Sequence, residues 1–234
     1  MNNDPIGAAI LDYARKRKSD EITVKSDICE DDFIPIELLF RSYDEMPDLE
    51  KKALKLCGDN VLDVGAGAGA HAHELLNLGK KVHCLDTSRG AVDYMRNTGL
   101  KAVKVDFFKF PSDPSYDSVL MLMNGIGIAG TLANLEHTLA HAKSFLKPGG
   151  KIICDSSDIK YLYEDEDGSM WIDLNTEYYG NFRFQMVYKQ DKGEWFDWLY
   201  VDFDNLFQAA KNVGLKARLV CEENDAYLAE LILA

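Results

Sequence analysis

The sequence predicts an α/β protein with a doubly wound, mostly parallel sheet of seven strands. From about residue 60, short runs rich in Val, Leu and Ile alternate with longer segments of helical periodicity. The runs are apolar on both faces, as strands covered by helices on each side should be. Only four residues separate the last two expected strands, so they form a hairpin and the final strand runs antiparallel to its neighbour.

Five strands are expected before this terminal hairpin, each from one apolar run. They cover 60–64, 81–85, 102–105, 118–123 and 151–154. Helices are expected between them over about 69–78, 88–97 and 132–145. Ser88 is the expected N-cap of the second helix, because its side chain can accept from a free backbone N–H of the first turn.

The chain after residue 155 follows a different pattern. We expect an acidic surface loop over 155–167 and then an inserted antiparallel hairpin over 178–201, whose aromatic residues roughly alternate. The remaining elements are a short helix capped by Asp204 and ending at Gly214, and terminal strands over 215–221 and 226–233. The hairpin therefore interrupts a single domain that covers 60–234.

Residues 1–59 are helical in pattern. Ile6 and Ile10 mark one apolar face, and Leu49 and Leu54 mark another. The segment is too short for a core of its own, so we expect an N-terminal helical cap over the open edge of the sheet.

The composition excludes several classes of partner. Lys and Arg number 26 against 39 Asp and Glu, which gives a formal net charge of −13 that would repel nucleic acid and anionic membranes. No apolar run approaches the roughly 20 residues of a membrane span. The five cysteines include no Cys-x-x-Cys pair, and no signal-peptide core is evident, so we expect a cytoplasmic protein.

The sharpest local signal is the segment VLDVGAGAGA at 61–70. An apolar strand enters a turn with glycines at Gly65, Gly67 and Gly69, and a helix follows at once. Alternate glycines let the backbone approach a ligand closely, and the helix N-terminus offers unpaired N–H donors. The pattern predicts a ligand-binding loop.

Three carboxylates follow this strand and its neighbours. Asp63, Asp86 and Asp106 each fall where a parallel strand ends, so they should meet at the carboxyl edge of the sheet. Gly65-x-Gly67-x-x-Ala70 also satisfies a loose dinucleotide fingerprint, which leaves an NAD(P)-dependent oxidoreductase as an alternative. The charge favours a cationic ligand with a ribose and an amino-purine, since one contact between unit charges at ~4 Å contributes about 4 kcal/mol before desolvation.

In these motifs the chain resembles the class I S-adenosylmethionine-dependent methyltransferases over about residues 55–234. The pieces that carry the resemblance are VLDVGAGAGA at 61–70, CLDTS at 84–88, VDFFKF at 105–110, YDSVLMLMNGIGIAG at 116–130 and LKPGGKI at 146–152. The antiparallel terminal strand pair also matches. The set is specific, although no single piece is.

The resemblance implies a role for each matching position. Asp63 and the glycine backbone would hold the methionine end of the cofactor, Asp86 the ribose hydroxyls, and Asp106 the adenine amino group. Arg41, before the first strand, is a candidate to clamp the cofactor carboxylate with two parallel hydrogen bonds, with a surface ion pair as the alternative. The expected cofactor-binding residues are Asp63, Gly65, Ala66, Gly67, Asp86, Thr87, Asp106, Phe107, Asn124, Gly125, Arg41 and Tyr43.

Methyl transfer is an in-line displacement, so a general base is needed only for a protonated acceptor. The candidates by position are Asp155, Asp158 and His137. The His pairs lack an evident third ligand, so no metal is expected. The Asn-Pro-Pro-aromatic motif of one acceptor class is missing, and a small-molecule acceptor is expected. The hairpin aromatics form a pocket wall or a homodimer surface, and a non-catalytic cofactor-binding regulator is a further alternative.

Overall fold

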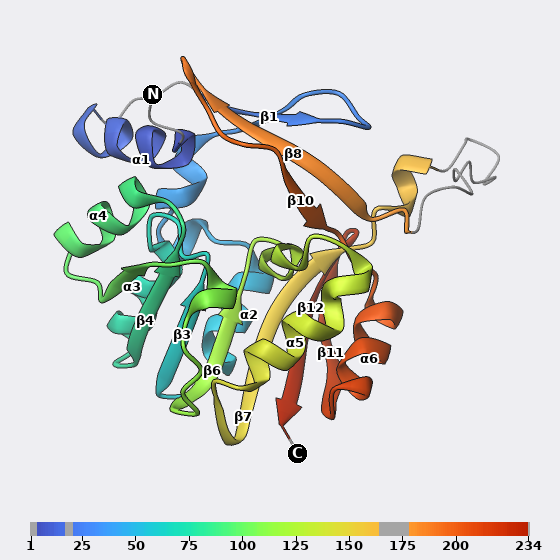
Figure 1. Ribbon diagram of the computed structural model, residues 1–234. Coiled ribbons are helices and arrows are strands. Elements are labelled where there is room, and N and C mark those ends of the chain that lie inside the picture. Colours follow the sequence, from blue (N-terminus) through green and yellow to red (C-terminus); the bar gives the residue numbers. More distant parts are fainter. Residues whose placement is uncertain (1–3, 17–20, 164–177, 234) are drawn as a thin grey trace.

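The computed structural model describes residues 4–16, 21–163 and 178–233, and its main body is a seven-stranded sheet (Figure 1). The strand order is β11-β12-β7-β6-β3-β4-β5, and β12 pairs antiparallel with both β11 and β7. The bounds are β3 Asn60–Val64, β4 Lys81–Asp86, β5 Ala102–Lys104, β6 Tyr116–Met121, β7 Leu146–Ser157, β11 Leu215–Glu223 and β12 Ala226–Leu233. The predicted mostly parallel sheet with an antiparallel last strand is confirmed.

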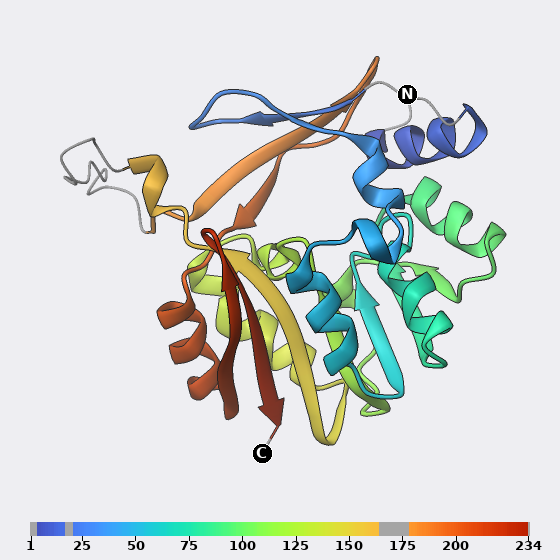
Figure 2. The same cartoon turned by 180° about the vertical axis from the view of Figure 1, so that it is seen from behind.

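Helices cover both faces of this sheet, as a doubly wound fold requires (Figures 1 and 2). One face packs against α5 and α6 through residues such as Leu139 and Leu206. The other packs against α2, α3 and α4 through Leu54, Leu75 and Met95. The bounds are α2 Asp48–Leu56, α3 Ala70–Asn77, α4 Arg89–Asn97, α5 Leu135–Lys143 and α6 Phe203–Asn212.

A second sheet, of order β10-β8-β1-β2 with β9 beside β8, lies over the carboxyl edge of the first (Figures 1 and 2). The predicted aromatic hairpin is confirmed, because Phe196 of β10 opposes Phe184 of β8 in antiparallel register. The bounds are β1 Ile22–Ser26, β2 Asp32–Ile34, β8 Asn181–Tyr188, β9 Asp191–Lys192 and β10 Phe196–Leu199.

The N-terminal segment is not the purely helical cap that the pattern predicts. It contains α1 Pro5–Lys16 and the short 3₁₀ helices η1 Ile36–Phe40 and η2 Tyr43–Glu45, but also β1 and β2. β1 pairs antiparallel with β8, with Val24 opposite Met186. Two short strands gain their stability from this distant hairpin, which explains why local periodicity does not reveal them.

Asp4 fastens α1 to the main domain. Its Oδ1 accepts from the Gly7 N–H at 2.9 Å, while Oδ2 accepts from the Ser88 hydroxyl and the Gly90 N–H, both at 3.0 Å. A Cβ at Gly90 would lie 2.5 Å from the Gly7 Cα, so the two glycines allow the backbones to touch. The second sheet, on which α1 packs, is thereby held over the main sheet.

Two expected boundaries need correction. β7 continues to Ser157, and η6 covers Lys160–Tyr163, so the start of the expected acidic loop is structured; the rest of that prediction lies outside the described residues. Asp202, rather than Asp204, caps α6, since its Oδ1 accepts from the Asn205 N–H at 2.9 Å. The predicted Ser88 cap of α4 is confirmed, with the Ala91 N–H at 3.0 Å from its hydroxyl.

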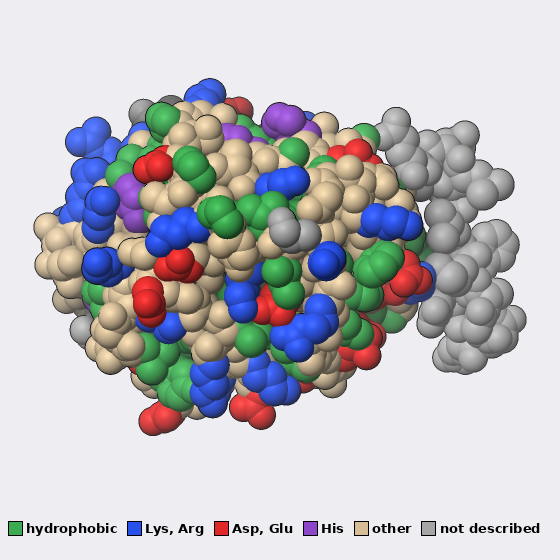
Figure 3. All heavy atoms as spheres, turned by 90° about the horizontal axis from the view of Figure 1, so that it is seen from below, with side chains coloured by type: hydrophobic (Ala, Val, Ile, Leu, Met, Phe, Trp, Pro, Cys, Tyr) green, Lys and Arg blue, Asp and Glu red, His purple; other side chains and the backbone are tan. Residues whose placement is uncertain are grey.

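The end of the molecule away from the second sheet carries a mixed surface. In Figure 3 its Lys and Arg side chains are spread among acidic and apolar ones. None of the described helices is long and apolar enough to span a membrane.

Candidate functional site

A cavity of about 1030 Å³ lies between the carboxyl edge of the main sheet and the inner side of the second sheet. Its walls bring together the glycine loop after β3, the ends of β4, β5 and β6, and side chains of the second sheet. From the main domain the lining includes Asp63, Gly65, Ala66, Gly67, Asp86, Thr87, Asp106, Phe107, Asn124 and Gly125. Eleven of the twelve expected cofactor-binding residues line it, these ten and Arg41.

The glycine loop leaves open space above its backbone. Gly65 and Gly67 have φ values of 72° and 57°, which other residues adopt only with strain. A Cβ at Gly65 would meet no atom within 4 Å, and one at Gly67 would meet only Leu39 Cδ2 at 3.9 Å. A ligand can therefore approach the loop directly.

Asp86 ends β4 and is held by the loop opposite it. Its Oδ2 accepts from the Gly67 N–H and its Oδ1 from the Ser88 N–H, both at 2.8 Å. Burial raises the pKa of Asp86 to about 6, although both backbone donors oppose the rise. A carboxylate oxygen has two lone pairs, so each retains capacity for a ligand hydroxyl.

Asp63 is the most buried of the three acids, with 2% of its surface exposed. No hydrogen-bond donor of the described residues reaches its buried Oδ2. Burial raises its pKa to about 6, with Asp86 acting in the same direction and His71 against it. Leaving a buried acceptor without a hydrogen bond costs free energy. A bound ligand that donates a hydrogen bond to this oxygen would remove that cost.

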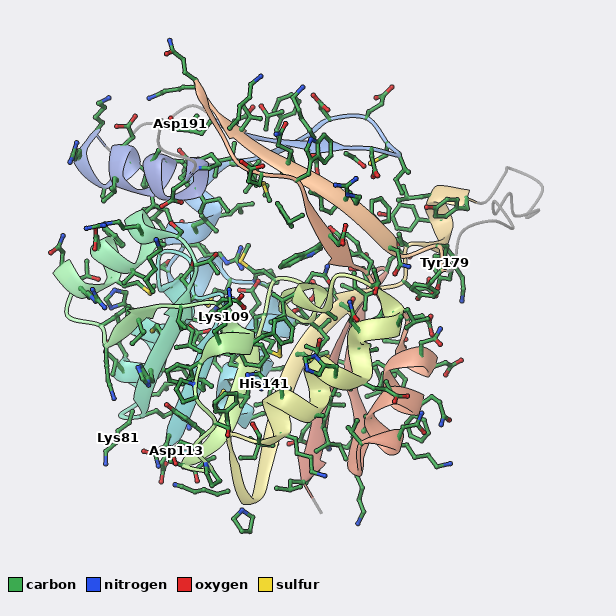
Figure 4. The ribbon with its side chains drawn as sticks, in the orientation of Figure 1. Lys81, Lys109, Asp113, His141, Tyr179 and Asp191 are labelled. Atoms are coloured by element: carbon green, nitrogen blue, oxygen red, sulfur yellow. The ribbon has the colours of Figure 1, made fainter. Side chains whose placement is uncertain are left out.

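Asp106 and Phe107 form the next part of the wall. Asp106 caps the 3₁₀ helix η3 Phe107–Lys109, accepting from the Phe108 N–H at 3.0 Å. The Phe107 carbonyl lies 2.8 Å from Nε2 of His141, which points from α5 toward this turn (Figure 4). The turn is thereby fixed with Asp106 at the cavity.

Asn124 forms the floor in a left-handed conformation, with φ at 55°. Its N–H donates to Asp155 Oδ1 at 2.9 Å, and its side-chain Oδ1 accepts from the Ser156 hydroxyl at 2.7 Å. The same hydroxyl accepts from the Val201 N–H at 3.0 Å. Ser156 therefore ties the floor of the cavity to the chain that leaves β10.

Arg41 lines the cavity, but Tyr43 does not. The Arg41 side chain is only 9% exposed and bonds to Glu50, so the alternative of a surface ion pair is wrong. The role expected for Tyr43 stays a prediction; its ring packs beneath Lys51, whose Nζ lies 5.7 Å from the ring centre.

The three candidate bases do not line the cavity. Asp155 turns to the Asn124 backbone, and burial raises its pKa to about 7. Asp158 accepts from the hydroxyl of Tyr179, which lies where β8 begins (Figure 4). His137 is exposed on α5 and stacks on Phe108 with ring centres 5.5 Å apart. Their placement gives no support to the predicted role as a general base.

Two groups at or behind the cavity are not revealed by the sequence pattern. The first is β1 of the second sheet, whose Val24 lines the cavity together with Phe184 and Trp198 of the expected hairpin. The second is Glu50 with His71, whose hydrogen bond joins the first turns of two helices. No metal site was expected, and none of the described residues forms a cluster of three potential metal ligands.

This arrangement defines the class I methyltransferase fold, and comparisons with known proteins agree. Residues 61–150 match the methyltransferase domain family. A crystal structure of an S-adenosylmethionine-dependent methyltransferase from Bacteroides fragilis, in complex with S-adenosyl-L-homocysteine, is 42% identical. The similarity covers 100% of this chain and 96% of that one, with a TM-score of 0.92.

The chain therefore belongs to the S-adenosylmethionine-dependent methyltransferases. This finding confirms the predicted family with its enzyme class and cofactor, in place of the dinucleotide alternative. A cypemycin N-terminal methyltransferase from Streptomyces is 32% identical over 107 residues, 44% of either chain. A demethylmenaquinone methyltransferase from Tropheryma whipplei is 31% identical over 107 residues, 43% of either chain. The chain thus spans less than half the length of these curated relatives.

Proposed function

We propose that this chain binds S-adenosylmethionine in the cavity and transfers its methyl group to a small-molecule acceptor. The observation that carries the proposal is that one cavity joins the glycine loop to the aromatic side of the second sheet. Its volume of about 1030 Å³ is at the upper end of the usual range for one ligand, which leaves room for a cofactor and an acceptor.

The charges of the lining support a cationic cofactor. Its acidic residues are Glu30, Asp31, Asp32, Asp63, Asp86, Asp106 and Asp197, against one arginine, Arg41. A diphosphate would meet strong repulsion here, whereas a sulfonium would be attracted. The residues present also fit the amino-acid end, because Arg41 and the unsatisfied Asp63 oxygen offer opposite charges to a carboxylate and an ammonium. Asp86 is suited to the ribose hydroxyls, and Asp106 with Phe107 to the adenine.

The part of the cavity proposed to hold the methyl acceptor is lined by the second sheet. Its lining residues are largely aromatic: Phe182, Phe184, Phe196, Trp198 and Tyr200. Such a wall favours a small apolar or aromatic acceptor and excludes water from it. The curated relatives are named for different acceptors, a peptide N-terminus and a quinone precursor, so their substrates are not carried over.

The bound cofactor supplies a methyl group already activated by the positive sulfur. The protein residues bind both molecules, align them and keep water out. Asn124 and Gly125 hold the floor between the two halves, and the aromatic wall orients the acceptor toward it. No residue needs to form a covalent bond to the methyl group.

Calorimetric titration with S-adenosylhomocysteine, with NAD as the comparison, tests the cofactor half. We expect saturable binding of S-adenosylhomocysteine and no binding of NAD. In a separate unfolding experiment, S-adenosylhomocysteine at 100 times its dissociation constant should raise the free energy of unfolding by about 2.7 kcal/mol. Transfer of labelled methyl groups to a panel of apolar and aromatic acceptors tests the other half. Binding of NAD instead, or turnover unaffected by Trp198→Ala, contradicts the proposal.

A homodimer through the hairpin, exclusion of nucleic acid and a cytoplasmic location stay predictions. Phe182 and Phe184 are buried rather than available to a partner, while Trp195 is 40% exposed. Light scattering of the purified protein measures the oligomeric state.

A further inference from the structure

A buried carboxylate bridges the side chains of Arg41 and His71 directly behind the cavity. Glu50, in the first turn of α2, accepts through Oε1 from Nη2 of Arg41. Its Oε2 lies 2.7 Å from Nε2 of His71, in the first turn of α3. The side chains of Arg41, Glu50 and His71 are 9%, 7% and 10% exposed. The three side chains form a largely buried cluster, unlike the exposed ion pairs of the surface.

Glu50 is held in its ionised form by these partners. Burial by itself raises the pKa of Glu50, but the hydrogen bonds and charges of His71 and Arg41 outweigh it, and the pKa lies below its ordinary value. Among the described residues, the Glu50 carboxylate is paired with Arg41 and His71, as a buried charge requires.

Arg41 and His71 line the cavity, whereas Glu50 does not. Of the three Arg41 guanidinium nitrogens, only Nη2 has a hydrogen-bond partner among the described residues, and Nε is buried without one. The Asp63 Oδ2 is buried without a partner as well. The site thus holds an unused donor and an unused acceptor on groups of opposite charge.

The contact with Glu50 limits how the Arg41 side chain can move. A free Arg41 side chain has several rotatable bonds, and ordering them on ligand binding costs free energy. The bond to Glu50 restrains the guanidinium and removes most of the entropy that a ligand would otherwise have to overcome. His71 fixes the other carboxylate oxygen, so Glu50 itself cannot turn away.

We propose that Glu50 is a positioning residue that holds Arg41 ready to bind the carboxylate at the amino-acid end of the cofactor. The inference rests on the proposed function of the cavity and adds to it a residue that does not touch the ligand. Glu50 would therefore affect recognition of the amino-acid end of the cofactor. Recognition of the nucleoside end, which is proposed for Asp86 and Asp106, would not depend on Glu50.

The test compares two ligands that share the nucleoside and the sulfur. S-adenosylhomocysteine carries the amino-acid group, and methylthioadenosine lacks it. In Glu50→Gln the charge that restrains Arg41 is lost. We expect calorimetric affinity for S-adenosylhomocysteine to fall roughly ten- to a hundredfold, as for a lost charged hydrogen bond, and affinity for methylthioadenosine to stay within about twofold.

Glu230→Gln is the matched control. Glu230 on β12 is also a buried acid with two basic partners, bonding to Lys151 and Arg218 at 2.6 Å each, but it lies outside the cavity lining. This variant should lose stability as Glu50→Gln does, with both affinities unchanged. An equal loss for both ligands in Glu50→Gln would show a structural role only and overturn the inference.

A double-mutant cycle with Arg41→Gln separates positioning of Arg41 from a purely structural role of Glu50. It measures whether the two substitutions are coupled in their effect on affinity for S-adenosylhomocysteine. If Glu50 acts through Arg41, Glu50→Gln has no further effect on S-adenosylhomocysteine affinity in the Arg41→Gln background. Additive losses contradict the inference.

Where Glu50→Gln fails to fold, Glu50→Asp makes the same comparison, because it keeps the charge but withdraws it by one methylene. Failure of the unmodified protein to bind S-adenosylhomocysteine would overturn the proposed function itself, whereas normal binding with no selective loss overturns only the role of Glu50.

Discussion

The Gly67 N–H donates to Asp86 Oδ2 at 2.8 Å, which joins the loop after β3 to the end of β4. Gly67 can point its N–H this way because it adopts a positive φ of 57°. The bond orients a carboxylate that burial alone would leave under-solvated. The same acid and the same loop face the cavity, so the contact prepares a ligand site rather than only closing a turn.

Replacing Asp86 should weaken cofactor binding while the fold persists. We expect Asp86→Ala to cost about 1–3 kcal/mol in the binding of S-adenosylhomocysteine, as loss of a charged acceptor does. Calorimetric titration measures the change, and circular dichroism checks the fold. Asp113→Ala is the control, because Asp113 is exposed at the end of the main sheet away from the cavity (Figure 4). Unchanged affinity in Asp86→Ala would remove Asp86 from the site.

Asp63 should destabilise the ligand-free protein at neutral pH. Burial raises its pKa from 3.8 to about 6, so the folded state binds the proton more tightly than the unfolded state does. The tighter binding of this proton stabilises the folded state fully below pH 3.8. This stabilisation is lost as the pH rises through about 6, where Asp63 ionises in the folded protein. A pKa difference of this size corresponds to about 3 kcal/mol.

Asp63→Asn removes this titration without changing the size of the side chain. We expect the variant to be more stable than the parent at pH 7, and the advantage to shrink as the pH falls toward 4. Urea unfolding at several pH values measures it. A constant difference between the two proteins across this range would show that Asp63 does not titrate as the burial implies.

Gly127 should be needed for the contact between the two sheets. It lies in the 3₁₀ helix η4 Gly125–Ala129, and a Cβ there would lie 2.4 Å from Nε1 of Trp198. Gly127→Ala should therefore displace the indole from the cavity wall and lower the free energy of unfolding by about 1–3 kcal/mol. In a Trp198→Phe background the same change should cost less, because the smaller ring leaves room. Equal costs in both backgrounds would show that the indole is not the obstacle.

Ser156 should stabilise the cavity floor more than an ordinary serine would. Its hydroxyl is buried and serves both Asn124 and Val201, so Ser156→Ala leaves two polar groups without a partner. The expected loss is about 1–3 kcal/mol in the free energy of unfolding, measured in urea. Ser144→Ala, at the half-buried end of α5, provides the comparison and should cost less. A larger loss for Ser144→Ala would contradict this account of the floor.

The row formed by Asp63, Asp86 and Asp106 was predictable because each acid lies at or next to the carboxyl end of a strand. Strands that are apolar on both faces identify a parallel sheet, and a parallel sheet fixes which edge its ligands use. Asp63, Asp86 and Asp106 needed no further information to be placed together. Asp155 shows the limit of this reasoning, since it also lies near a strand end but turns to the backbone of Asn124.

The second sheet and Glu50 were not predictable in the same way. β1 is five residues long and pairs with a strand more than 150 residues away, so no local period marks it. Glu50 occupies a helix start, where an acid normally serves the helix dipole in solvent. Only the three-dimensional packing of α2 against α3 shows that its partners are Arg41 and His71.

A crystal structure of the protein grown with S-adenosylhomocysteine tests the central claim most directly. The claim predicts density in the cavity between the sheets, with the ribose hydroxyls within hydrogen-bond distance of Asp86 and the sulfur facing the aromatic side of the second sheet. Density elsewhere, or a ribose that makes no contact with Asp86, would contradict it.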